Sequence, residues 1–325
     1  MRPPGALCNG LLRPRRLCIA GGFRYAVSPP TGRDMSSTAS PADPALPSLA
    51  ELRASLDRID DAIHDLLMQR AEVVTAVAAL GARGKVPFRP GREADILRRL
   101  LARHSGPLPA RVLARIWREL FAATTSMQGS YVIAVCEPDP PGGFVACARE
   151  HFGALTPMRV HRSPAHAIAE VIAGAATAAV LPVPQEDEPV RGAWWTALLH
   201  RDAPRVYIVA RLPFWTPRPE SATQAQAMVV AATAADPSGR DNTLIGFELP
   251  PDMSRARLSA ALAAADLSPS GLIVRRDPAG QAAHGLIVVE GYVTDTDPRL
   301  AGLAQSVQRP VVLGAYAVPM DADPQ

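Results

Sequence analysis

A long heptad pattern without helix breakers constrains the fold of this 325-residue chain more than any other feature. Ser48 and Glu51 have the spacing of a capping box, and apolar residues then recur at alternating intervals of three and four, as in a coiled coil. This pattern predicts a helix over residues 49–83, about 50 Å long at 1.5 Å per residue. Such a helix cannot bury its seam within a small single-chain domain, so we expect a homodimer through it. The seam residues are Leu49, Leu52, Leu56, Ile59, Ile63, Leu66, Val73, Val77 and Leu80.

The rest of the chain predicts a multidomain protein. Residues 1–47 are read as a disordered leader, because the stretch before the helix is rich in Pro, Ser, Thr and Asp. Helical spacing after Pro90 and after Pro109 completes an all-α three-helix domain over residues 48–129. Strands and helices then alternate over 130–235, which predicts an α/β lobe, and residues 242–320 have the βαββαβ order of a ferredoxin-like domain.

Composition excludes several classes of function. The net charge is only +3, which argues against a large nucleic-acid surface, and no apolar run approaches the roughly 20 residues of a membrane span. The four cysteines form no CxxC pair and no His/Cys cluster, so we expect no metal site and reduced thiols in a cytoplasmic protein. The basic N-terminus leaves two alternatives open, a tail before a true start at Met35 and a transit peptide.

Arg70 is a charge at a seam position where its neighbours in the register are apolar. A charge there must be paired or must face a ligand, although a polar residue that sets the coiled-coil register is the alternative. Arg53 lies about 260° round the same helix at 100° per residue, so the two arginines cannot serve one pocket from one chain. In an antiparallel dimer, Arg53 of one chain can meet Arg70 of the other.

Further polar residues stand on the next two predicted helices. Arg92 and Glu93 lie at the start of the second helix, and Thr124 and Gln128 are four residues apart on the face that continues the apolar residues of the third. These positions, together with Arg53 and Arg70, resemble the all-helical chorismate mutases found alone or fused to prephenate dehydratase.

The resemblance implies a role for each of these residues. Arg53 of the partner chain and Arg70 would bind the two carboxylates of chorismate, and Glu93 would accept from the ring hydroxyl. Arg92 would support the corner of the second helix, Gln128 would donate to the ether oxygen, and Thr124 would lie near the ring carboxylate. The pericyclic rearrangement of chorismate to prephenate needs a folded substrate and well-placed donors, with no nucleophile, proton shuttle or cofactor.

One position departs from the family. The family usually has a lysine that donates to the ether oxygen where this chain has Gly81. Arg83 and Lys85 are close in sequence and could take its place if the helix unwinds at Gly81, which glycine permits. Arg89 stands where the family often has an acidic residue.

The second half resembles an eroded prephenate dehydratase followed by its ACT effector domain. The stretch 181–185 is similar to the family's Pro-Ile-Glu-Asn motif, but Gln226, Ala227 and Met228 replace its catalytic Thr-Arg-Phe motif. We therefore expect no dehydratase activity, and the effector motifs of the ACT domain are unrecognisable.

Two functions remain open from the sequence. The first is a chorismate mutase in phenylalanine and tyrosine biosynthesis, whose small-molecule substrate is chorismate. The alternative is a non-catalytic regulatory or binding partner of another enzyme of aromatic biosynthesis. Retention of Arg53, Arg70, Glu93 and Gln128 favours the first, and loss of the lysine at Gly81 favours the second.

Overall fold

The computed structural model describes residues 47–80, 88–188, 192–200, 203–216, 218–276 and 283–320. The chain divides into two units, residues 1–59 and 60–325. The predicted leader up to residue 46 lies outside the described residues, as do Gly81, Arg83 and Lys85. None of the helices in the described ranges is long and apolar enough to cross a membrane.

The heptad segment forms helix α1 (Leu49–Leu80). Its capping box is present as predicted: the Ser48 amide donates to Glu51 Oε2 at 2.7 Å, and the Glu51 amide donates to Ser48 Oγ at 3.2 Å. These bonds satisfy two amides that a helix start leaves without partners. No residue of α1 is buried, and its apolar seam is exposed.

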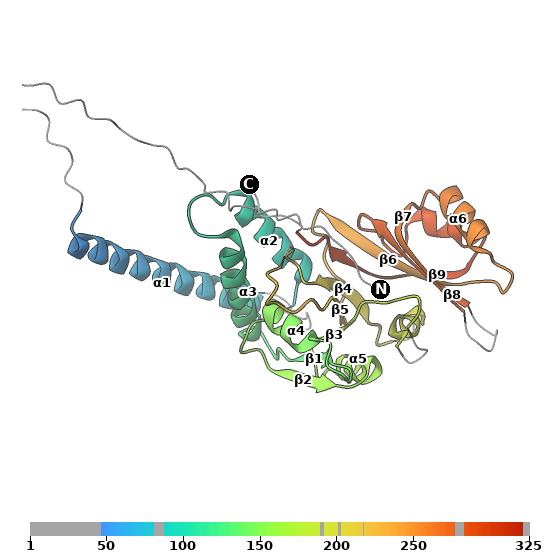
Figure 1. Ribbon diagram of the computed structural model, residues 1–325, viewed down its shortest axis with the longest axis horizontal. Helices are drawn as coiled ribbons and strands as arrows, with labels where there is room; N and C mark the ends of the chain where they lie inside the picture. The colour runs from blue at the N-terminus through green and yellow to red at the C-terminus, as the bar shows by residue number, and fades with distance from the viewer. Residues whose placement is uncertain are drawn as a thin grey trace, which may run out of the picture. The chain divides into compact units, whose positions relative to one another are not determined.

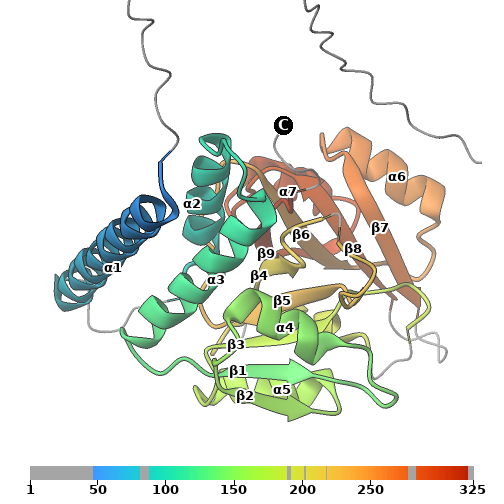
Figure 2. The same cartoon turned by 60° about the vertical axis from the view of Figure 1, so that its left-hand side comes forward.

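Two shorter helices follow where the sequence predicts them, α2 (Pro90–Ala102) and α3 (Ala110–Ser126). Pro90 occupies the first turn of α2, where a proline's missing amide has no helical partner to lose. The two helices pack through a shared cluster that includes Leu97, Leu101 and Phe121. This helical region precedes the sheet (Figures 1 and 2).

A nine-stranded mixed sheet forms the rest of the described chain, in the order β2-β1-β3-β5-β4-β9-β6-β8-β7. The first three strands of this order are parallel, and β5 is antiparallel to both β3 and β4. The strands are β1 (Ile133–Cys136), β2 (Met158–His161), β3 (Ala178–Pro182), β4 (Tyr207–Leu212), β5 (Ala227–Ala231), β6 (Asp241–Glu248), β7 (Pro269–Arg276), β8 (Ala283–Glu290) and β9 (Gln308–Ala317).

Helices cover both faces of the first half of the sheet, as alternation along β1 shows. Ala134 and Cys136 pack in one cluster with α5 (Pro164–Ile172), whereas Ile133 and Val135 pack in another with α4 (Phe144–Phe152). Successive side chains of a strand point to opposite faces, so α4 and α5 lie on opposite sides of the sheet, as Figure 2 shows. The cluster on the α5 side also takes in a 3₁₀ helix, η1 (Trp194–Leu199), which the sequence analysis missed.

The second half of the sheet confirms the predicted ferredoxin-like pattern. Its elements follow in the order β6, α6 (Arg255–Ala264), β7, β8, α7 (Pro298–Leu303) and β9. In space the strands run β9-β6-β8-β7, so the first and third strands of the motif are central. The helices α6 and α7 share one hydrophobic cluster with β6, β8 and β9.

The two halves of the sheet meet at β4 and β9, which pair in parallel at Ile208 and Gly314. Gly314 has a φ of 142°, and a Cβ atom there would lie 2.0 Å from the carbonyl oxygen of Ile208. Only glycine therefore allows this approach of the two backbones. The predicted boundary between the α/β lobe and the ferredoxin-like domain falls between β5 and β6, which belong to this single sheet.

Candidate active site at the end of α3

Arg70 and the C-terminal end of α3 come together in the structure. The Nη1 of Arg70 donates to Thr124 Oγ1 at 3.4 Å, and its guanidinium lies 6.0 Å from the ring centre of Phe121. The side chain is half-buried, and desolvation lowers the pKa of Arg70. The lone charge in the seam is thus held against α3, at the end of the helix that carries Thr124.

Thr124 and Gln128 follow each other along this end of α3 and its C-terminal extension. Thr124 is buried, and its hydroxyl donates to the Leu120 carbonyl at 2.7 Å, which is the usual bond of a threonine inside a helix. The Nε2 of Gln128 donates to the Thr124 carbonyl at 3.0 Å, while the residue itself is exposed. Arg70, Thr124 and Gln128 therefore form one polar cluster, called the α3-end cluster below.

Glu93 is engaged elsewhere. Its Oε2 accepts from Arg118 Nη1 at 2.9 Å, and the two side chains are only 11% and 8% exposed. Burial raises the pKa of Glu93 to about 7, although the positive charge of Arg118 opposes that shift, and burial also lowers the pKa of Arg118. The sequence analysis did not find Arg118 as the partner of Glu93, because 25 residues separate them in the chain.

The start of α2 is attached to the loop between β5 and β6. Arg89 Nε donates to Asp236 Oδ2 at 2.8 Å, and Arg98 donates to the carbonyls of Ser238, Arg240 and Val318. A Cβ atom on Gly91 would lie 2.0 Å from the Asp236 carbonyl oxygen, so the glycine is required for this approach. The arginine at position 89, unusual for the family, thus has a structural partner here.

Arg92 and Arg53, two further predicted site residues, make no hydrogen bond or ion pair with the α3-end cluster in the described part of the chain. Arg92 is exposed and pairs with Asp95 one turn further along α2. Arg53 is exposed on the part of α1 that belongs to the first unit. Among the described residues, no group of three or more His, Cys, Asp or Glu side chains could hold a metal ion.

The three-helix region of the chain matches a known protein family. Residues 52–129 match the family model for chorismate mutase type II. The chain carries a chorismate mutase domain. A bifunctional chorismate mutase/prephenate dehydratase of Stutzerimonas stutzeri is 31% identical over 147 residues, which cover 43% of this chain and 40% of the relative. A protein of the same description from Neisseria gonorrhoeae is 36% identical over 102 residues, which cover 31% of this chain and 27% of the relative. The matches thus span less than half the length of these relatives.

Solved structures also align with part of the chain. A prephenate dehydratase from Streptococcus mutans aligns with a TM-score of 0.44 and 15% identity, covering 58% of this chain and 99% of its own. A quorum-quenching acylase aligns with the same TM-score and 18% identity, covering 58% of this chain and 96% of its own.

Proposed function

We propose that this protein is a chorismate mutase that converts chorismate to prephenate. The observation that carries the proposal is the α3-end cluster, in which the half-buried guanidinium of Arg70 donates to Thr124 of α3, whose carbonyl accepts from Gln128 just beyond the helix, all within the matched family region. A dianionic substrate needs a cation of this kind, and the ether oxygen that gains charge in the transition state needs a donor.

Each residue of the α3-end cluster has a task in this proposal. Arg70 binds one carboxylate of the substrate, because a guanidinium matches a carboxylate with two parallel hydrogen bonds. Gln128 releases the Thr124 carbonyl and turns its Nε2 to the ether oxygen, a movement that its exposed position allows. Holding the substrate in its folded conformer is the main work, since the reaction is intramolecular and moves no proton.

A second copy of the chain belongs to this proposal. The α1 seam is exposed along its whole length, and apolar residues such as Ile63, Leu66 and Val73 need a partner surface. Arg53 of that copy supplies the second carboxylate contact. The exposed seam supports the proposal, because a helix with this pattern gains its stability by packing its apolar stripe.

The second half of the chain contributes no dehydratase activity in this proposal. Gln226 stands where the family has its catalytic threonine, and its Oε1 accepts from Arg211 Nη2 at 3.1 Å. Ala227 is buried at the start of β5 and offers no functional group. Incubating the protein with prephenate should yield no phenylpyruvate above the uncatalysed background.

The pairing of Glu93 favours a second candidate function. The family's acceptor for the ring hydroxyl is bound to Arg118 here, and Gly81 replaces the lysine. A domain that keeps the helical fold with part of its site engaged internally suits a non-catalytic regulatory or binding partner of an enzyme of aromatic biosynthesis.

Loss of chorismate absorbance on adding purified protein distinguishes the two functions. A chorismate mutase should consume chorismate, and Arg70→Leu or Gln128→Ala should slow it by about 10²–10³, the usual effect of removing one preorganised charge or donor. Gln69→Ala is the matched control, because Gln69 is an exposed glutamine on α1 beside Arg70. No loss of chorismate absorbance with the folded wild-type protein would exclude the first function in favour of the second.

A further inference from the structure

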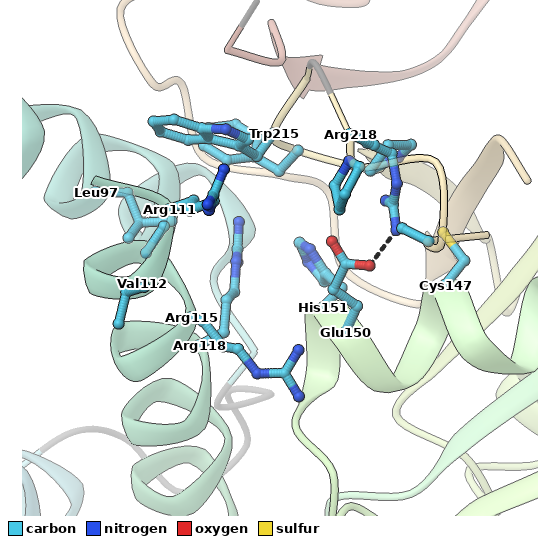
Figure 3. Close-up of a pocket in the computed structure, with 15 residues that line it drawn as sticks. Leu97, Arg111, Val112, Arg115, Arg118, Cys147, Glu150, His151, Trp215 and Arg218 are labelled. Atoms are coloured by element: carbon cyan, nitrogen blue, oxygen red, sulfur yellow. Dashed lines mark hydrogen bonds and ion pairs between the residues drawn. The ribbon is translucent and has the colours of Figure 1, made fainter. Parts of the chain in front are cut away.

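A cavity of about 320 Å³ lies between the N-terminal half of α3, helix α4 and the segment that follows β4 (Figure 3). It is separate from the α3-end cluster, since neither Arg70 nor Thr124 nor Gln128 lines it. Its size falls within the range of sites for small molecules, which is roughly 300–1,000 Å³. All of its walls belong to the second unit of the chain.

Positive charge dominates the walls of this cavity. Arg111, Arg115 and Arg118 follow one another at intervals of four and three along α3, so they share one face of the helix. Arg218 faces them from the segment after β4, as Figure 3 shows. Glu150 is the single carboxylate among the lining residues, and Arg218 Nη2 already pairs with it.

Two buried groups in the walls have hydrogen-bonding atoms without a partner among the residues that the structure describes. The side chain of Arg218 is only 7% exposed, and its Nε and Nη1 have no acceptor among the described residues. The Nε2 of His151 is likewise buried and unpartnered. Burial and the nearby Arg118 hold the pKa of His151 well below its usual value, so its ring is neutral. In the neutral tautomer that carries its hydrogen on Nε2, this atom is a hydrogen-bond donor. Buried donors of this kind are normally satisfied, and an anionic oxygen would satisfy them.

The lining also includes apolar side chains. Phe214 and Trp215 stand beside the aliphatic side chains of Leu97 and Val112. The guanidinium of Arg118 lies 5.1 Å from the ring centre of Phe214, which holds it at the junction between the apolar and charged walls. An occupant that matches both parts has an apolar body and an anionic end.

We propose that this cavity binds a small carboxylate with an aromatic or other apolar body. Arginine is suited to this, because its planar fork holds a carboxylate by two parallel bonds. The carboxylate reaches Arg218 and His151, Arg111 and Arg115 at the exposed edge attract it, and the body lies against Trp215 and Phe214. The proposal is independent of chorismate mutase activity, since it uses none of the residues of the α3-end cluster.

Titration calorimetry on the full-length protein tests the proposal with three probes. The first is 3-phenylpropanoate, the second is its neutral analogue 3-phenylpropanamide, and the third is inorganic phosphate. The carboxylate should bind, the amide should bind at least about tenfold more weakly for lack of charge-assisted bonds, and phosphate should bind more weakly for lack of a body. Equal affinity for the carboxylate and the amide would overturn the proposal, and so would tighter binding of phosphate.

Variants locate the bound probe. Arg115→Gln should weaken binding of the carboxylate by about tenfold, and its exposed position leaves the fold intact. Arg218→Gln should weaken it further, and a circular dichroism spectrum establishes that this variant is folded. Arg99→Gln, an exposed arginine of α2 outside the cavity, is the matched control and should change nothing. If Arg70→Leu abolishes binding while Arg115→Gln does not, the probe occupies the α3-end cluster and the proposal fails.

Discussion

The buried pair of Glu93 and Arg118 allows a quantitative test of how this domain is stabilised. The two side chains are 11% and 8% exposed and joined at 2.9 Å, so removing one partner leaves a buried group without its counter-charge. Burial nevertheless raises the pKa of Glu93 to about 7, so the fold favours the uncharged carboxyl, and Glu93→Gln, which mimics that form, should lie within about 1 kcal/mol of the wild type at pH 5. Arg118→Met leaves the Glu93 carboxylate without its counter-charge at pH 8, and Glu93→Gln combined with Arg118→Met should restore most of the stability lost there, since no charge then remains in the site.

Arg118→Met alone should behave differently from Glu93→Gln, because a carboxylate can take up a proton. Burial already raises the pKa of Glu93 to about 7, and removal of the opposing charge raises it further. The destabilisation caused by Arg118→Met should thus be large at pH 8 and small at pH 5. Glu93→Gln has no carboxylate to ionise, so its stability relative to the wild type should rise between pH 5 and pH 8.

Ionisation of Glu93 should also make the free energy of unfolding of the wild-type protein depend on pH. The pKa of Glu93 in the folded state, about 7, is higher than its ordinary value of 4.5, so its contribution to stability is complete below pH 4.5. That contribution is lost as the pH rises through 7, with a slope of at most about 1.4 kcal/mol per pH unit for one proton. Glu93→Gln should remove this part of the decline.

Urea unfolding followed by far-ultraviolet circular dichroism measures these differences on the full-length protein. Transition midpoints are compared at equal slopes, from pH 5 to pH 8. The reasoning is refuted if Arg118→Met is as stable at pH 8 as at pH 5, or if the double variant is as unstable at pH 8 as Arg118→Met alone. A large effect of Glu93→Gln on turnover would in addition place Glu93 at the substrate.

Three further predictions concern the helical domain. Arg70→Leu should leave the free energy of unfolding unchanged or raise it, because its bond to Thr124 is long, while turnover is lost; unfolding of this variant in the urea assay would show a structural role. The full-length protein should sediment at twice its monomer mass, and Ile63→Glu in the exposed seam should give the monomer; a wild-type monomer contradicts the pairing of α1. Gly81→Lys should increase the rate of chorismate turnover more than Gly81→Ala does. The alanine is the control, because replacing a glycine favours helix formation by roughly 1 kcal/mol without adding a donor. Equal rates for the two variants would show that no donor is missing at this position.

Local patterns made much of this fold predictable. The capping box at Ser48 and Glu51, the prolines before α2 and α3, and the alternation of short strands and helices are all encoded within a few neighbouring residues. The order β6-α6-β7-β8-α7-β9 could be read directly from such segments. The 3₁₀ helix η1 could not be predicted, because a helix of six residues is too short to give a periodic signal, although its tryptophans are deeply buried.

Partners that are distant in the chain could not be read in this way. The sequence singled out Glu93 but contains no sign that Arg118 would meet it. Nor does it indicate that Arg218 comes to face the arginines of α3, because about 100 residues separate them and the fold alone brings them together. Arg70 was predictable as a charge in the apolar seam, and Thr124 and Gln128 as polar residues on an apolar helix face, whereas the roles predicted for them come from the family resemblance.

The place of β9 in the sheet has a consequence for how the chain acquires its structure during synthesis. This strand is the last that the structure describes, and it lies between β4 and β6. Until residues 308–317 leave the ribosome, β4 and β6 each present an open edge, with β5 and β8 as their single neighbours. Open edges of this kind can pair with other chains. A nascent chain that stalls before β9 therefore has two strands, β4 and β6, whose unpaired edges can bind other chains. Insertion of β9 between them pairs both edges at once.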